Sequence, residues 1–169
     1  MTDDTKDPIT VPSVDLTRYL GTWYEIARLP FAHEDIADRD VIAQYSFEEN
    51  GKIHVVNRCV TASGEQEVAV GVAEPVDPSN AKLEISFLPE GLRWVPFTKG
   101  DYWILRLDPD YTTALVGTPD RKHLWLLSRT PRMDPARRDE WLATASAQGF
   151  DLTDIIHTPQ TDEPFPSAK

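Results

Sequence analysis

The sequence predicts an all-β domain: an eight-stranded antiparallel up-and-down β-barrel with one C-terminal α-helix packed against its outside. Eight short segments alternate apolar and polar side chains, which is typical of strands with one buried and one solvated face. Turn residues separate most of these segments, and this favours strands that pair with their neighbours in the chain. A single helix signal follows the last segment.

The alternation is clearest in Val41 to Glu48, where Val41, Ala43, Tyr45 and Phe47 share one face. The residues Glu49 to Lys52 then supply a turn into the next strand. Closing eight strands into a barrel removes their exposed edges and leaves room for a cavity. The expected strands are Thr22 to Leu29, Val41 to Glu48, Lys52 to Thr61, Glu67 to Val76, Lys82 to Leu88, Gly100 to Leu107, Thr112 to Gly117 and His123 to Arg129.

The expected helix follows the last strand. Asp134 is placed as an N-cap, Pro135 suits the first helical position, and Gly149 can end the helix about four turns later. One apolar stripe should pack on the outside of the barrel, and it consists of Trp141, Leu142 and Ala145.

The length of 169 residues predicts one domain, over residues 14–160, between a flexible arm at 1–13 and a flexible tail at 161–169. A net charge of -11 without a basic stretch argues against nucleic-acid binding. The only cysteine, Cys59, allows no internal disulfide and is expected to be buried. No signal peptide or membrane span is apparent, so we expect a cytoplasmic protein, or an outer-membrane or periplasmic one if a leader has been trimmed.

Three short motifs occur in order along the chain: Gly21 and Trp23 in VDLTRYLGTWYEIARLP, Asp110 and Tyr111 in GDYWILRLDPDYTTALVG, and Arg129 in LWLLSRTP. This set resembles the three signatures of the lipocalin family, in the form found in bacterial lipocalins, apolipoprotein D and plant temperature-induced lipocalins. The resemblance implies that Trp23 lies across the closed end of the barrel with Arg129 stacked over it, a cation-π contact worth about 0.5 to 2 kcal/mol. It also implies that Gly21 is small because the chain crosses the barrel floor there.

The resemblance implies binding, storage or transport of a small apolar ligand, such as a fatty acid or lysophospholipid, inside the barrel, without a cofactor. A homodimer is also compatible with it. The alternation of polarity places five side chains in the interior: Tyr45, Asn57, Phe87, Trp103 and Leu105. The resemblance adds Trp125 to the expected ligand-binding wall. If they face inward, Ala69, Gly71 and Ala73 leave room for the ligand.

The apolar segment at residues 92–97 is expected at the open end, where it can close over a ligand, touch a membrane or a second subunit, or fold onto its own barrel. The alternative function is an enzyme of the cyclase or isomerase type that confines an apolar polyene or polyketide, with Tyr45 or Asn57 orienting it. No G-x-S-x-G or H-E-x-x-H motif and no metal site is present in the sequence. Asp108 and Asp110 are spaced like a carboxylate pair, but the resemblance places them in a turn where they cap backbone groups.

Overall fold

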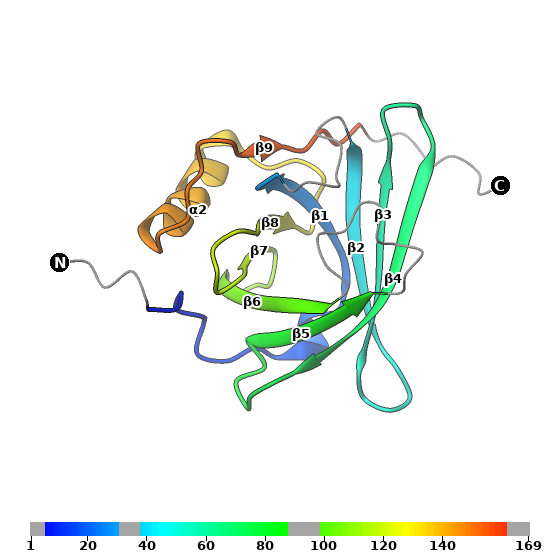
Figure 1. The fold of residues 1–169 in the computed structure, drawn as a ribbon, viewed down its shortest axis with the longest axis vertical. Coiled ribbons are helices and arrows are strands. Elements are labelled where there is room, and N and C mark those ends of the chain that lie inside the picture. Colours follow the sequence, from blue (N-terminus) through cyan, green and yellow to red (C-terminus); the bar gives the residue numbers. More distant parts are fainter. Residues whose placement is uncertain (1–5, 31–37, 88–98, 162–169) are drawn as a thin grey trace.

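The computed structural model describes residues 6–30, 38–87 and 99–161. This part of the chain forms a closed barrel of eight antiparallel strands, with one further short strand and two helices (Figure 1), which confirms the predicted fold class. The elements are α1 (Leu16–Tyr19), β1 (Gly21–Arg28), β2 (Arg39–Phe47), β3 (Ile53–Val60), β4 (Gln66–Pro75), β5 (Lys82–Phe87), β6 (Lys99–Leu107), β7 (Thr113–Gly117), β8 (Leu124–Ser128), α2 (Pro135–Ala147) and β9 (Ile156–His157).

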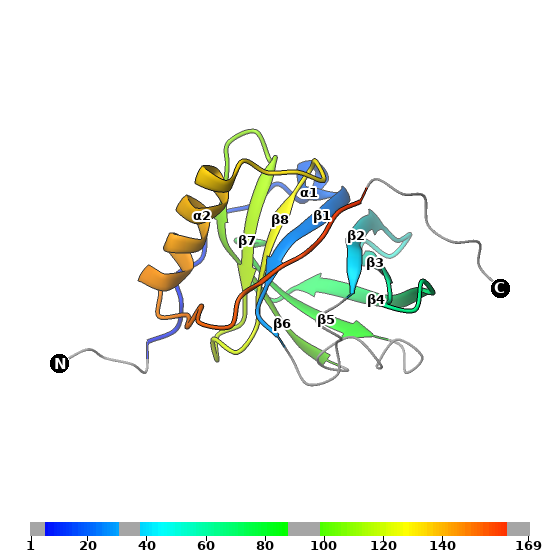
Figure 2. The same cartoon turned by 90° about the horizontal axis from the view of Figure 1, so that it is seen from above.

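Each barrel strand pairs with its neighbours in the chain, and β1 closes the circle by pairing with both β8 and β2. The pairing with β2 runs from Gly21 opposite Tyr45 to Tyr24 opposite Ile42. The second half of β1 pairs instead with β9, so the chain after α2 lies beside β1 (Figure 2). The C-terminal segment therefore covers the gap between β1 and β2.

All eight predicted strands are present, with ends within two residues of the predicted ones. The sequence pattern does not predict α1 or β9, which have four and two residues. Asp15 caps α1, because its carboxylate accepts a hydrogen bond from the Thr17 backbone N–H at 3.1 Å. Elements this short are below the length at which periodicity is informative.

The predicted α2 packs on the outside of the barrel, against β7 and β8 (Figures 1 and 2). Asp134 is its N-cap and accepts a hydrogen bond from Ala136 N at 3.2 Å. Gly149 follows the helix with φ +91°, a conformation that favours glycine. The buried stripe of α2 consists of Trp141, Leu142 and Ala145.

The barrel wall has two apolar sides. The interior cluster includes Trp23, Tyr45, Tyr102, Ile104 and Val116. The outer cluster lies between the wall and α2, and it contains Trp103, Leu105, Leu115, Leu124, Leu126, Trp141, Leu142, Ala145 and Phe150 among others.

The inward orientation predicted for Trp103 and Leu105 is wrong, because both side chains belong to the outer cluster under α2. A β-bulge between Ile104 and Arg106 shifts the register with β7. The bulge puts Leu105 and Arg106 on the same outer face, so alternation counted from Arg106 gives the wrong face, and Tyr102 and Ile104 face the interior instead. Apolar character could not distinguish the two faces of this strand, since α2 makes the outer face dry as well.

Residues 6–13 are the described part of the expected flexible arm, and they make hydrogen bonds to the body of the protein. Val11 N donates to Ile104 O at 3.0 Å, and Arg121 donates to Lys6 O at 2.6 Å. The apolar segment at residues 92–97 lies outside the described residues. Within residues 6–30, 38–87 and 99–161, no helix is long and apolar enough to span a membrane.

Candidate functional site

The closed end of the barrel is organised around Arg129. Its guanidinium lies 3.8 Å from the centroid of the Trp23 ring, so the stacking implied by the sequence resemblance is present. It also donates hydrogen bonds to the backbone oxygens of Tyr111 at 3.1 Å, Thr22 at 3.1 Å and Arg18 at 2.8 Å. Three segments of the chain are thereby joined at the floor of the barrel: residues 18–23, the turn at Tyr111 and the end of the last barrel strand.

Gly21 is tightly restricted at the same place. Its φ of +107° is one that residues with a side chain rarely adopt, and a Cβ atom there would lie 3.1 Å from Arg129 Nη1. The close approach of this guanidinium explains why a glycine occupies the start of β1.

The turn between β6 and β7 is fixed by a carboxylate. Asp108 accepts hydrogen bonds from Thr112 N at 2.6 Å and Thr113 N at 2.8 Å, which is the capping role expected for it. Tyr111 follows with φ +57°, and its hydroxyl accepts a hydrogen bond from Asp15 N at 2.8 Å. Asp110 is exposed in the same turn. These contacts hold α1 under the barrel.

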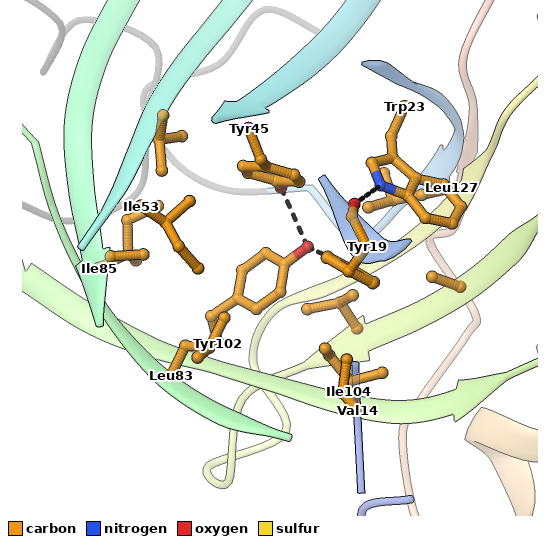
Figure 3. Close-up of a cluster of buried hydrophobic side chains, with 14 of the residues drawn as sticks. Val14, Tyr19, Trp23, Tyr45, Ile53, Leu83, Ile85, Tyr102, Ile104 and Leu127 are labelled. Carbon is orange, nitrogen blue, oxygen red and sulfur yellow. Dashed lines mark hydrogen bonds between the residues drawn. The ribbon is translucent and has the colours of Figure 1, made fainter. Parts of the chain in front are cut away.

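Three tyrosine hydroxyls meet inside the closed end (Figure 3). The Tyr102 oxygen lies 2.6 Å from that of Tyr19 and 3.0 Å from that of Tyr45. Burial raises the pKa of all three phenols, that of Tyr45 to about 12, so all three are neutral at physiological pH. We call Tyr19, Tyr45 and Tyr102 the tyrosine trio.

A small cavity of about 10 Å³ lies beside the tyrosine trio. The rest of its lining is aliphatic and consists of Ile53, Ala73, Leu83 and Ile85. Such a volume is close to the minimum that holds one water molecule. The cavity can therefore receive the end of a ligand but not a whole lipid.

Asn57, Phe87 and Trp125 also face the interior, at levels above the tyrosine trio. Asn57 pairs with Ala43 and Ala69. The side chains of Asn57, Phe87 and Trp125 remain partly exposed although they line the inner wall. The Phe87 ring lies over Gly71, where a Cβ atom would be 3.0 Å from Phe87 Cδ1. Part of the room expected beside Gly71 is thus filled by this ring.

Four of the six predicted ligand-facing residues are therefore brought together in one interior: Tyr45, Asn57, Phe87 and Trp125. Among the described residues, the Asn57 Oδ1 atom is buried without a hydrogen-bond partner. Their contact with a ligand stays a prediction.

Comparison with known proteins agrees with this architecture. Residues 14–160 match the lipocalin-like domain family. The chain belongs to the lipocalin family. Members of this family bind small hydrophobic ligands.

Two relatives and one solved structure illustrate how this lipocalin compares with others. It is 38% identical over 162 residues to temperature-induced lipocalin-1 of Arabidopsis thaliana, covering 94% of this chain and 86% of the relative. It is also 38% identical over 152 residues to outer membrane lipoprotein Blc of Escherichia coli K12, covering 89% and 81%. Insecticyanin of the tobacco hornworm Manduca sexta has the same fold, with a TM-score of 0.69, 20% identity and coverage of 93% and 86%.

The lipocalin interior also contains an ion pair that the sequence pattern does not predict. Arg28 Nη1 lies 2.8 Å from Glu25 Oε2, and the Thr158 hydroxyl donates to the same carboxylate oxygen at 2.6 Å. Glu25 pairs with Leu127, and Arg28 with Trp125, so both charged side chains share the inner face of the wall. Burial raises the pKa of Glu25, and the charge of Arg28 opposes this effect.

A signal for this pair existed in the sequence: Glu25 is two residues after Trp23 and so has the same parity. Charged side chains are expected in water, so this parity alone does not predict that Glu25 faces the interior. Elsewhere in the described residues, no group of three or more His, Cys, Asp or Glu side chains is arranged to hold a metal ion. Cys59 is buried, as expected.

Proposed function

We propose that this lipocalin binds a lipid, such as a fatty acid or lysophospholipid, inside the barrel for storage or transport. The observation that carries the proposal is the gradient along the inner wall. Inward side chains at the closed end, such as Ile53 and Ala114, are buried, while Asn57 and Trp125 remain partly exposed toward the other end. An acyl chain would cover this apolar inner surface, at roughly 25 cal/mol for each Å² removed from water.

Polar groups on the inner wall support an amphiphilic ligand over a pure hydrocarbon. The amide of Asn57 has an oxygen atom available for a hydrogen bond. A few placed polar groups among apolar side chains are typical of small-molecule sites. Binding without turnover needs nothing more than this arrangement, and we propose a carrier role rather than a catalytic one.

The first experiment is native mass spectrometry of the protein purified from its own host, followed by denaturing extraction and identification of the released molecule. We expect a stoichiometric fatty acid or lysolipid. A protein that carries no small molecule and also fails to bind a fluorescent acyl probe would contradict the proposal.

A pair of adjacent substitutions localises binding to the interior. Asn57→Phe fills the inner wall and removes the buried amide oxygen, so we expect loss of acyl-probe binding with the barrel intact. Val56→Phe places the same ring on the outer face, since Val56 has the opposite parity in β3. It should leave probe affinity unchanged. Equal affinity loss in both variants would argue against an interior site.

A further inference from the structure

The tyrosine trio brings hydroxyl groups from three separate elements to one point. Tyr19 ends α1, Tyr45 lies in β2 and Tyr102 in β6 (Figure 3). The rings are packed as well, with centroids 5.9 Å apart for Tyr19 and Tyr45 and 6.0 Å apart for Tyr45 and Tyr102. The packing fixes the positions of the hydroxyl oxygens and leaves mainly their hydrogens free to turn.

Two of the three hydroxyl hydrogens of the tyrosine trio are used in hydrogen bonds within it, and the third is not. Each hydroxyl carries one hydrogen, and the two contacts at Tyr102 use two of the three, whichever way they point. No other hydrogen bond to these hydroxyls occurs among the described residues. A buried donor without an acceptor is unfavourable, so the third hydrogen calls for an acceptor in the adjacent cavity.

The uncharged lining of the cavity determines which kind of hydrogen-bond acceptor can be bound there. All three tyrosines line it, and none of the side chains in its lining carries a charge at neutral pH. The burial that raises the pKa of these phenols also opposes any other anion at the same place. A carboxylate would lose its hydration there, and the nearby Arg129 is already stacked on Trp23 and bonded to backbone oxygens. A hydroxyl or carbonyl oxygen needs only the one hydrogen bond.

We propose that the tyrosine trio is a subsite for a neutral oxygen, a hydroxyl or a carbonyl, at the end of the ligand that enters the barrel first. The inference rests on the proposed function, because the ligand must occupy the barrel to reach this point. It narrows the ligand to lipids that carry an oxygen far along their chain. Any charged end of such a ligand then stays at the level of Asn57 and Trp125 or beyond.

The test uses competition against a fluorescent acyl probe. The competitors are ω-hydroxy fatty acids of increasing chain length, each paired with the unsubstituted acid of the same length. At the length that reaches the trio, the wild-type protein should bind the ω-hydroxy acid at least as well as the plain acid. The triple variant Y19F/Y45F/Y102F should bind the ω-hydroxy acid about tenfold more weakly and the plain acid with little change.

Tyr24→Phe is the matched control, because Tyr24 lies opposite Ile42 on the outer face of β1. It should leave both affinities unchanged. A second measurement does not depend on folding of the triple variant: the infrared carbonyl stretch of a bound ω-oxo fatty acid should move to lower frequency than in hexane, since a hydrogen bond weakens the C=O bond.

The outcomes separate this inference from the proposed function. If plain acids displace the probe but an ω-hydroxyl lowers affinity at every length, equally in the wild type and the triple variant, the subsite is refuted and lipid binding stands. An unshifted carbonyl stretch has the same meaning. If no acid displaces the probe, the proposed function itself fails.

Discussion

At the scale of single residues, Arg129 has more partners than any other side chain at the closed end. Its stacking on Trp23 accounts for one face of the guanidinium, and the backbone oxygens of Thr22, Tyr111 and Arg18 account for its edge. These oxygens lie in two stretches that are distant in sequence, residues 18–22 and the turn at Tyr111. Arg129, the basic residue of the third lipocalin signature, therefore holds the floor of the barrel together. This role does not depend on the ligand.

Replacing Arg129 by Met should lower the free energy of unfolding by about 3 kcal/mol, because the cation-π contact and several charge-assisted hydrogen bonds are lost together. Urea denaturation followed by tryptophan fluorescence measures the change. Arg138→Met is the control, since among the described residues the Arg138 side chain bonds only to the exposed carboxylate of its neighbour Asp139 at 3.1 Å. It should cost less than about 0.5 kcal/mol. Equal costs would show that Arg129 contributes little.

The tyrosine trio predicts a loss of stability at alkaline pH. Burial raises the pKa of Tyr45 from 10.0 to about 12 in the folded protein, while in the unfolded chain the phenol titrates near its usual value. The unfolded state therefore releases this proton first, and stability falls as pH rises from 10.0 through about 12. Urea denaturation at increasing pH should show the decline, and Y19F/Y45F/Y102F should reduce it. If the stability of the triple variant fell as steeply with pH as that of the wild type, the tyrosine trio would not be the cause of the decline.

At the scale of elements, the regular strands were predictable and the irregular ones were not. Pairing is regular from Ile42 to the end of β2 and along β3 to β5, so parity correctly placed Tyr45, Asn57 and Phe87. In β6 the bulge after Ile104 reverses the faces, and no local residue pattern announces it. A similar irregularity between Glu25 and Ala27 lets β1 turn both Glu25 and Arg28 inward.

A residue of the candidate site could therefore be predicted from the sequence only where its strand is regular. The sequence placed the Tyr45 member of the tyrosine trio, but Tyr102 was hidden by the bulge and Tyr19 by the brevity of α1. The meeting of three hydroxyls is a product of barrel closure, which brings β2, β6 and α1 together from distant parts of the chain. Spacing along one sequence carries no signal for such a meeting.

The N-cap of α2 offers a prediction at the same scale. Asp134→Ala removes the acceptor for Ala136 N and should lower the free energy of unfolding by about 1 kcal/mol. Asp139→Ala, within the same helix, removes an exposed carboxylate and should change it by less than about 0.5 kcal/mol. Thermal unfolding by circular dichroism compares the two. A larger effect at Asp139 would argue against the assigned cap.

At the scale of the whole molecule, the segment after α2 completes the wall. Gln160 Nε2 donates to the backbone oxygens of Glu25 at 2.9 Å and Val41 at 3.0 Å, and so links β1 to β2 where these strands no longer pair. Thr158 adds its hydroxyl to the buried pair of Glu25 and Arg28. The barrel is held shut by this segment as well as by its own strands.

Thr158→Val keeps the shape of the side chain and removes the donor to Glu25. The carboxylate then lacks one of its buried partners, and we expect a loss of about 1 to 3 kcal/mol in the free energy of unfolding. Thr22→Val is the control, since within the described part of the chain the Thr22 hydroxyl makes only a 3.4 Å contact with Gln44 Nε2. Guanidinium denaturation of both variants tests the difference, and a neutral Thr158→Val would mean that the segment is not fastened there.

This arrangement has a consequence for protein synthesis. Thr158 follows Glu25 by 133 residues, so β1 leaves the ribosome long before the chain that covers its edge and hydrogen-bonds its buried ion pair. Until then the nascent protein exposes an unpaired strand edge beside an apolar interior, the combination most open to association with other chains. Ribosome-bound intermediates of this protein should therefore depend on chaperones until residue 161 has emerged.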